Sequence, residues 1–149
     1  LGSGRLCRHC QHRAQGDRLH AGASSPLQNA RIADAPRRIE ICRNAILQRD
    51  FEKFASIVEA DSDIMHAVMM TSNPALFYWQ PATLRVMQAV RDWRAVGLPV
   101  FYTIDAGPNV HVITLREKMD EVKAKLIGLE GVKDVLRATV GGAAKLLEG

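Results

Sequence analysis

The hydrophobic residues in the first half of the chain repeat with the spacing of amphipathic helices. From Pro36 onward, apolar side chains recur every three or four residues, which predicts a first helix with Pro at its start. Asp50 is a favourable N-cap, so we expect a second helix to follow it and to end near Ser72-Asn73-Pro74. The apolar positions of these helices are Ile39, Cys42, Ile46 and Leu47, then Phe51, Phe54, Ile57, Val58, Ile64, Met65 and Val68.

A change of period after residue 99 predicts a β-hairpin. Apolar residues between Leu84 and Trp93 indicate a third helix, which Gly97 and Pro99 close. The run FYTI that follows is β-branched and aromatic, and it predicts a strand. The turn formers in DAGPN interrupt this strand, and VHVI resumes it as a second one.

The remaining pattern predicts one more helix and two short strands. The helix is expected from the spacing of Leu115, Met119, Val122 and Leu126. The sequence VKDVLRATVGGAAKLLEG predicts strands on both sides of Gly141-Gly142. Segregated helices and strands indicate an α+β fold, in which helices cover one face of an antiparallel sheet. We assign this domain to residues 24–149 and interpret residues 1–23 as an irregular tail of aberrant sequence.

Length and composition agree with one packed domain. The chain has 149 residues, and 47% of them are hydrophobic, which is enough for a core. No apolar run approaches the roughly 20 residues of a membrane-spanning helix, so we expect a soluble protein with no membrane partner. Three cysteines and no recognisable signal peptide favour a reducing compartment, and we expect the cytoplasm. Because the chain starts with Leu1, we expect its N-terminus to be incomplete.

The basic residues do not form a nucleic-acid-binding pattern. The formal net charge is +4, and much of the surplus lies near the N-terminus and in residues 31–49. These stretches lack interleaved aromatic residues and any known RNA- or DNA-binding motif, so we expect no nucleic-acid partner. We interpret Arg37, Arg38 and Arg43 as a solvated basic face.

The tail allows a competing hypothesis of a metal site. Cys7, Cys10, His12 and His20 offer four ligands of the kind that zinc takes. Their spacing does not match a zinc finger or ribbon, and no second cysteine pair follows. We therefore expect no metal here, and we place Cys42 in the helical core.

Asp105 is an acid at the end of a predicted strand, next to a Gly-Pro-Asn turn. One interpretation is chemical: a carboxylate here can be held partly out of water and directed at a hydroxyl group as a general base. The other is structural: in an Asx-type turn, the Asp105 side chain accepts hydrogen bonds from the N–H groups of Gly107 or Asn109. Spacing alone favours the structural interpretation.

The wider sequence changes this balance. The stretch RNAILQRDFEKFASIVEADSDIMHAVMMTSNPALFYWQPAT, followed by FYTIDAGPNVHVI, resembles the C-terminal half of the diphosphomevalonate decarboxylases of the GHMP kinase superfamily. The family's landmarks occur in the same order: a helix with DF..F, then DS...H, an aromatic stretch after a proline, and a strand that ends in DAGPN. The last motif is the most specific, and the resemblance extends over residues 24–147.

This resemblance implies a role for Asp105. Members of the family use ATP to phosphorylate the tertiary 3-hydroxyl of a phosphorylated mevalonate, and loss of phosphate and carbon dioxide then gives an isopentenyl phosphate. The acid that matches Asp105 removes or polarises the hydroxyl proton, so Asp105 is the expected catalytic residue. By the same resemblance, we expect Ser62, His66, Ala106 and Gly107 to bind the substrate. His66 has an equal alternative as a hydrogen-bonded residue at the edge of the core.

The resemblance also implies parts that this sequence lacks. Family members are about twice as long, and their N-terminal half carries the ATP loop; LGSG at residues 1–4 is a poor substitute, because no strand and helix flank it. We expect ATP and Mg²⁺ in the complete enzyme, bound mainly by a separate N-terminal domain, and no activity from this chain alone. A truncated gene, a frameshift or a split enzyme would explain the difference. The choice between a mono- and a diphosphate substrate stays open.

Two other functions stay open as well. A non-catalytic α+β module for binding or dimerisation, including a homodimer, would keep this fold without turnover. A sibling mevalonate kinase would phosphorylate its substrate without decarboxylation, although DAGPN favours the decarboxylases. Ser24 and Ser25 precede the first helix and are either helix caps or phosphate donors, of which capping is the commoner role.

Overall fold

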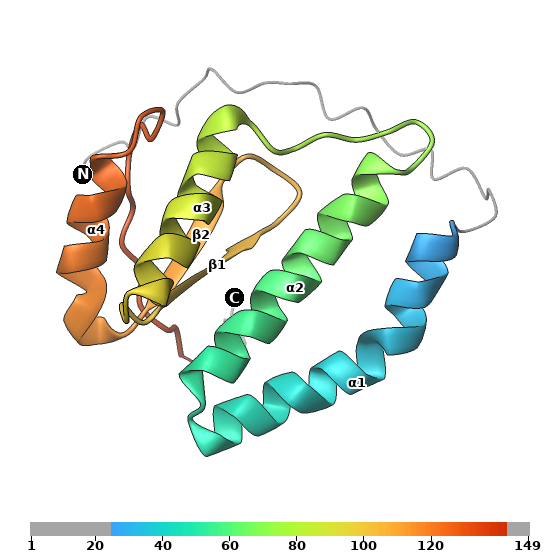
Figure 1. The fold of residues 1–149 in the computed structure, drawn as a ribbon, viewed down its shortest axis with the longest axis horizontal. Coiled ribbons are helices and arrows are strands. Elements are labelled where there is room, and N and C mark those ends of the chain that lie inside the picture. The colour runs from blue at the N-terminus through green and yellow to red at the C-terminus, as the bar shows by residue number, and fades with distance from the viewer. Residues whose placement is uncertain (1–24, 143–149) are drawn as a thin grey trace, which may run out of the picture.

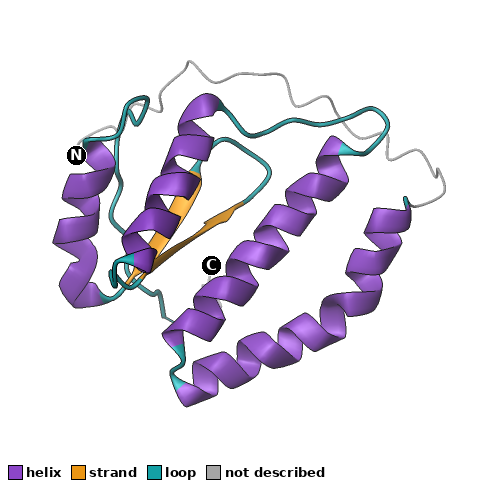
Figure 2. Ribbon diagram, viewed as in Figure 1, coloured by secondary structure: helices purple, strands orange, loops and turns teal. Residues whose placement is uncertain are grey.

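The computed structural model of the protein describes residues 25–142, which form four helices and one hairpin (Figure 1, Figure 2). The elements are α1 (Pro26–Gln48), α2 (Phe51–Met70), α3 (Pro81–Ala95), β1 (Val100–Ile104), β2 (Val110–Thr114), a 3₁₀ turn (Arg116–Lys118) and α4 (Met119–Ile127). The two strands form one antiparallel sheet. The expected α+β class is confirmed.

Helix α1 begins at Pro26 and not at Pro36, so the predicted start is wrong. The Ser25 hydroxyl caps the helix by accepting the N–H of Gln28 at 3.1 Å, which confirms the capping role; Ser24 lies outside the described residues. Pro36 lies inside the helix, where it removes one backbone hydrogen bond. Figure 1 shows α1 changing direction partway along its length, as a helix does at an internal proline.

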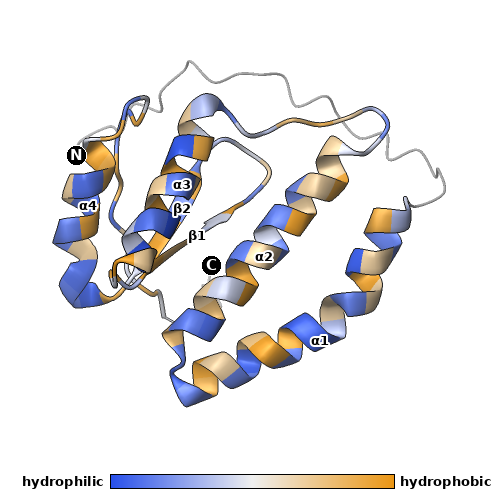
Figure 3. Cartoon of the chain, viewed as in Figure 1, coloured by the Kyte–Doolittle hydropathy of each residue, from blue (hydrophilic) through white to orange (hydrophobic). Residues whose placement is uncertain are grey.

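The apolar residues that predicted α1 do not form its buried face. Ile39, Ile46 and Leu47 are 68%, 56% and 70% exposed, and Cys42 is only partly buried, so its expected place in the core is wrong. Together with Arg43, these residues line a shallow apolar depression. Figure 3 shows hydrophobic positions alternating with hydrophilic ones along α1. Within residues 25–142, no element covers this surface.

The buried face of α1 carries Arg38 and Ala45 instead. The Arg38 side chain is 7% exposed, and it donates at 2.9 Å both to Asp61 of α2 and to Asp34, one turn earlier in α1. Its second terminal nitrogen donates to the carbonyl of Arg31 at 2.9 Å. The predicted solvated basic face is therefore wrong for Arg38, because an ion-pair network joins α1 to α2 there.

One face of the hairpin forms the floor of the main core. In the antiparallel register, Val100 lies opposite Thr114 and Ile104 lies opposite Val110. Since successive side chains of a strand alternate between faces, Val100, Tyr102 and Ile104 share one face, and each is at most 1% exposed. Helices α3 and α4 cover this face. Their buried contributions are Val86, Met87, Val90, Val122 and Leu126.

The opposite face of β1 packs against the start of α2. Phe101 is 2% exposed, and its ring meets Phe51 and Phe54 edge-on, with centroids 5.5 and 5.2 Å apart. Edge-to-face pairs of this kind contribute about 0.5–1.5 kcal/mol beyond burial. Asp50 caps this end of α2, as predicted, because its carboxylate accepts the N–H of Lys53 at 3.0 Å. This packing sets where the rest of α2 meets β1.

The predicted strand between α4 and Gly141 is wrong, because residues 132–142 contain no strand. Leu136 is 88% and Val140 is 100% exposed, so this part of the segment has neither a pairing partner nor a covered face. The second predicted strand falls on residues 143–149, outside the described residues.

The apolar docking of the segment after α4 involves its first residues, and Arg137 further along forms an ion pair with Asp120 of α4 at 2.8 Å. Val132 and Val135 pack against the main core. Gly131 permits this close approach: its φ is +88°, and a Cβ at this position would lie 2.8 Å from Cβ of Ala82 in α3. Apolar docking on α3 therefore takes the place of the expected strand pairing.

The N-terminal predictions also fall outside the described residues. They are the irregular tail at residues 1–23 and the rejected zinc set Cys7, Cys10, His12 and His20. Between residues 25 and 142, no helix combines the length and apolar character that crossing a bilayer requires. The same part of the chain holds no group of three His, Cys, Asp or Glu side chains that could bind a metal ion.

Candidate active site at the hairpin turn

Asp105 directly follows β1, and its side chain reaches into solvent. The carboxylate is 87% exposed, and its Oδ2 lies 3.5 Å from Nε2 of His111 on β2. The N–H of Gly107 donates to the backbone carbonyl of Asp105 at 2.8 Å, so this part of the turn closes through the main chain. The turn therefore does not use the carboxylate to hold Gly107, and the group is accessible to a ligand.

The rest of the turn is exposed and is tied to α3. Ala106, Pro108 and Asn109 are exposed, and a Cβ added at Gly107 would meet no atom within 4 Å. The buried hydroxyl of Thr83 donates to the carbonyl of Pro108 at 3.3 Å. The turn thus offers open space beside Asp105 while α3 holds its far side.

Ser62 of α2 is buried against the end of β1. Its Oγ donates to the carbonyl of Ile104 at 3.2 Å and accepts the N–H of the same residue at 3.0 Å. The side chain of Ser62 therefore satisfies both main-chain groups of Ile104, which lie on the edge of β1 that faces away from β2. A neighbouring strand would fill this position in a larger sheet.

His66 lies one turn further along α2 and reaches the same carbonyl. Its Nε2 is 3.3 Å from the carbonyl oxygen of Ile104, and the residue is 1% exposed. Since a carbonyl oxygen only accepts hydrogen bonds, this contact requires the hydrogen on Nε2. The ring also packs on Trp79 and Tyr78, with centroids 5.2 and 6.2 Å away. These contacts hold the imidazole in one orientation.

Glu59 continues this row of polar side chains toward the start of β1. Its carboxylate accepts two hydrogen bonds from Arg94 of α3, at 2.6 and 2.7 Å, and one from the N–H of Tyr102 at 3.3 Å. Arg94 also donates to the carbonyl of Val100 at 3.1 Å. The hydrogen bond from Arg94 to Glu59 raises the pKa of Arg94. Side chains of α2 and α3 therefore pair the outer edge of β1 along its length.

A second polar group links the same three elements at the Tyr102 hydroxyl. This hydroxyl donates to the carboxylate of Asp63 in α2 at 3.1 Å. Arg91 of α3 donates to the Tyr102 hydroxyl oxygen and to Oδ2 of Asp63, each at 2.6 Å. Burial raises the pKa of Asp63, although the hydrogen bond from Tyr102 and the charge of Arg91 oppose this shift. Burial and the charge of Asp63 also raise the pKa of Tyr102. The phenol therefore acts as a structural donor.

The structure thus gathers the predicted residues around one peptide group. Ser62 and His66 are buried against the carbonyl of Ile104, and Asp105, Ala106 and Gly107 follow it in the turn. Neither buried side chain contacts the Asp105 carboxylate directly. Their expected contact with substrate stays a prediction.

Sequence reasoning missed Glu59 and Thr83 as residues of this site. Glu59 precedes Ser62 by three residues and His66 by seven, a spacing that places all three on one face of a helix. This pattern could have indicated Glu59. No local signal indicates Thr83, because its partner Pro108 lies in a distant loop.

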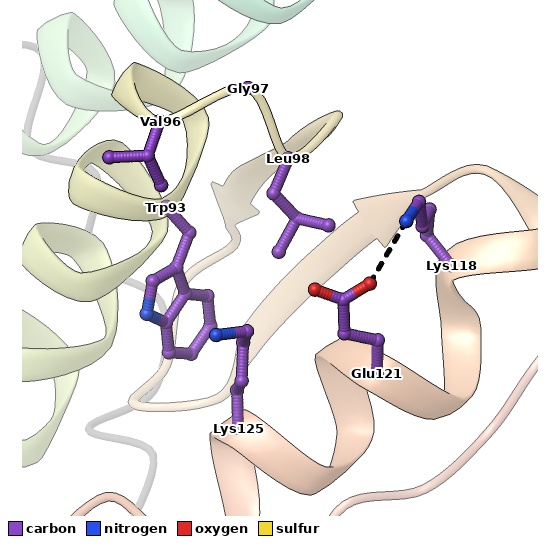
Figure 4. Close-up of a pocket in the computed structure, with 7 residues that line it drawn as sticks. All are labelled: Trp93, Val96, Gly97, Leu98, Lys118, Glu121 and Lys125. Carbon is purple, nitrogen blue, oxygen red and sulfur yellow. Dashed lines mark hydrogen bonds and ion pairs between the residues drawn. The ribbon is translucent and has the colours of Figure 1, made fainter.

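A small depression lies at the other end of the hairpin (Figure 4). Its volume is about 200 Å³, and it is lined by residues of α3, of the loop that follows α3 and of α4, among them Trp93, Leu98 and Lys125. Lys118 and Glu121 form an ion pair at its rim, at 3.1 Å. Because Leu98 precedes β1 and Lys118 follows β2, this depression is remote from the turn that carries Asp105.

Comparisons with known sequences relate the chain to one domain of the mevalonate diphosphate decarboxylases. It matches the family model of the mevalonate 5-diphosphate decarboxylase C-terminal domain over residues 18–143. It is 33% identical over 134 residues to the phosphomevalonate decarboxylase of Haloferax volcanii, which covers 89% of this chain and 41% of the relative. It is 41% identical over 108 residues to the diphosphomevalonate decarboxylase of Aspergillus fumigatus, which covers 70% and 26%. The chain spans less than half the length of these relatives.

Solved structures agree with the sequence comparisons. One match is the mevalonate diphosphate decarboxylase of Enterococcus faecalis, with a TM-score of 0.67 and 29% identity. The match covers 74% of this chain and 35% of that one, and that structure concerns a mechanism of ATP binding mediated by mevalonate diphosphate. The enzyme of Legionella pneumophila matches with a TM-score of 0.67 and 27% identity, over 76% and 36%. The chain therefore belongs to the family of mevalonate 5-diphosphate decarboxylase C-terminal domains.

Proposed function

We propose that this chain supplies the Asp105-bearing part of an ATP-dependent decarboxylase that acts on a phosphorylated mevalonate. The observation that carries the proposal is the position of Asp105: an accessible carboxylate at the end of a buried strand, next to an open turn. The named activities of the matched relatives support the substrate class, since they include decarboxylases of phosphomevalonate and of diphosphomevalonate. The substrate is accordingly a mevalonate mono- or diphosphate.

Asp105 is the catalytic residue in this proposal. Its carboxylate accepts or polarises the proton of the substrate 3-hydroxyl, which makes the hydroxyl oxygen a better nucleophile toward a phosphoryl group. The exposed Ala106 and the open space beside Gly107 leave room for the carbon chain of the substrate next to the carboxylate.

ATP and Mg²⁺ are proposed to bind mainly to a separate N-terminal domain. The residues around the turn do not by themselves fit a polyphosphate, because Asp105 is an acid and the side chain that pairs with it is a single histidine, His111. Polyphosphates are bound by several cationic side chains or by the N–H groups of a loop that opens a helix. The chain corresponds to 35% of the Enterococcus faecalis enzyme, which leaves ample length for such a domain.

Reconstitution tests this proposal. The chain would be mixed with the part of the Haloferax volcanii relative that precedes the matched region, and release of phosphate and carbon dioxide would be measured with both mevalonate phosphates. We expect turnover only with both polypeptides present. Asp105→Asn should lower kcat by about 10²-fold or more, because it removes the base, with an unchanged unfolding midpoint, because the side chain is exposed.

Asp92→Asn is the matched control, since Asp92 is an exposed acid on α3, away from the turn. An unchanged kcat in Asp105→Asn would reject the catalytic role. Formation of ADP without carbon dioxide would favour a mevalonate kinase. Ligand binding or self-association without turnover would favour a non-catalytic module.

A further inference from the structure

We propose that Ser62 and His66 are positioning residues, which orient the Asp105 carboxylate by holding the peptide group of Ile104 and do not touch the substrate. This inference rests on the proposed catalytic role of Asp105. It differs from the expectation that Ser62 and His66 bind the substrate directly.

The hydrogen bonds of Ser62 leave no donor for a substrate. A serine hydroxyl has one hydrogen, and Oγ of Ser62 gives it to the Ile104 carbonyl at 3.2 Å while accepting the Ile104 N–H at 3.0 Å. The side chain is buried, with the residue 4% exposed. A buried hydroxyl whose hydrogen is already donated to Ile104 has none to offer a substrate bound at the exposed turn.

His66 is committed in the same way. Its Nε2–H is directed at the Ile104 carbonyl at 3.3 Å, and the residue is 1% exposed beneath Trp79 and Tyr78. Two side chains from successive turns of α2 therefore converge on one carbonyl oxygen. Such double donation to a single acceptor at the end of a strand fixes both the tilt and the direction of its C=O bond.

Planarity of the peptide bond carries this restraint to Asp105. The carbonyl carbon and oxygen of Ile104 lie in one plane with the nitrogen, the hydrogen and the Cα of Asp105. Holding the oxygen therefore holds the Cα from which the carboxylate projects. The Thr83 contact to Pro108 holds the other side of the turn, so the exposed acid stands on a loop that is restrained at both ends.

The first experiment tests the restraint on this chain alone, without any activity. In Ser62→Ala, amide hydrogen exchange at Ile104 should accelerate at least about tenfold, while exchange at Tyr102, which is bonded to Glu59, serves as an internal reference. The backbone order parameter of Asp105 should fall from about 0.85 to below about 0.6. Ser56→Ala, an exposed serine on the same helix, should change neither quantity.

His66 provides the second pair of variants. His66→Gln keeps an N–H near the position of Nε2 and should preserve the order of Asp105, whereas His66→Leu has similar bulk and no donor and should lose it. If Ser62→Ala fails to fold, this pair makes the same comparison. The proposal would be overturned by an unchanged backbone order parameter of Asp105 in His66→Leu. An unchanged rate of amide hydrogen exchange at Ile104 in Ser62→Ala would overturn it as well.

The second experiment uses the reconstituted enzyme. Ser62→Ala and His66→Leu should lower kcat by about ten- to a hundredfold with little change in KM, because a misplaced base slows the reaction without weakening binding. His66→Gln should recover most of the rate. A raised KM with an unchanged kcat would overturn the proposal and indicate direct substrate contact. Full activity in Asp105→Asn would instead reject the proposed function, and the exchange experiment would remain the separate test of the restraint.

Discussion

At the scale of single residues, Glu59 is the buried charge with the most partners at the edge of β1. It is 4% exposed, and its carboxylate accepts hydrogen bonds from the Arg94 side chain and from the N–H of Tyr102. A buried ion pair of this kind adds little net stability compared with an apolar pair, but the loss of one partner leaves the other charge uncompensated. The edge of β1 is therefore sensitive to the charge of Glu59.

We predict that Glu59→Gln destabilises the chain by about 3 kcal/mol, because the largely buried Arg94 then keeps only the more distant, exposed Glu52, at 4.0 Å, as a counter-charge. Urea unfolding followed by circular dichroism measures this difference. Glu52→Gln is the matched control on the same helix: Glu52 also pairs with Arg94, but at 4.0 Å and with a side chain that is 71% exposed, so its effect should stay within about 0.5 kcal/mol. Equal effects of the two substitutions would contradict the structural role of Glu59.

Residue patterns predicted the position of Asp105 but not its supports. The strand followed by turn formers placed the acid at the end of β1, and the structure has it there. Helical spacing also puts Ser62 and His66 on one face of α2. Their shared partner Ile104 lies about forty residues further along, and such a pairing depends on tertiary packing that local periodicity does not contain.

At the scale of elements, α1 shows why its existence was easier to predict than its orientation. The helical spacing of Ile39 and Ile46 is genuine, yet both side chains are exposed. The face toward α2 is selected by Arg38, whose guanidinium can satisfy Asp34, Asp61 and a carbonyl together. A chain that spans part of its relatives' length can leave an apolar face uncovered, so periodicity alone does not identify the buried side.

We predict that Arg38→Ala destabilises the docking of α1 on α2 by about 1–3 kcal/mol. The substitution removes bonds to Asp34, Asp61 and the Arg31 carbonyl, although water can partly replace them at Asp61, which is 45% exposed. Arg37→Ala is the matched control, since Arg37 is adjacent, has the same charge and is 63% exposed. Urea unfolding curves measure the free energy of unfolding of both variants. A loss of stability in Arg37→Ala as large as that in Arg38→Ala would contradict the role of the Arg38 ion-pair network.

At the scale of the whole molecule, two carboxylates shape the dependence of stability on pH in opposite directions. Burial raises the folded-state pKa of Asp63, so the folded chain holds this proton more tightly than the unfolded chain does. Hydrogen bonds from Arg37, and from Arg38, lower the pKa of Asp34 to about 2. The contribution of Asp63 is therefore largest below pH 3.8 and falls as pH rises, whereas that of Asp34 is present above pH 3.8 and is lost toward pH 2.

We predict opposite pH trends for the two asparagine variants. Relative to Asp63→Asn, the unmodified chain should lose stability as pH rises from below 3.8 toward neutrality. Relative to Asp34→Asn, it should lose stability as pH falls from about 4 toward 2. Urea midpoints measured at a series of pH values test both trends. Parallel curves for either variant and the unmodified chain would show that the carboxylate in question does not shift its pKa on folding.

The side-chain pairing of β1 also decides how this sheet can join other polypeptides. The main-chain groups on the outer edge of β1 are hydrogen-bonded to the side chains of Glu59, Ser62 and Arg94. Another strand therefore cannot pair with this edge unless α2 is displaced. Within residues 25–142, no strand lies beyond β2. Intermolecular β-addition, whether productive assembly or the first step of aggregation, therefore has a single point of entry on this hairpin.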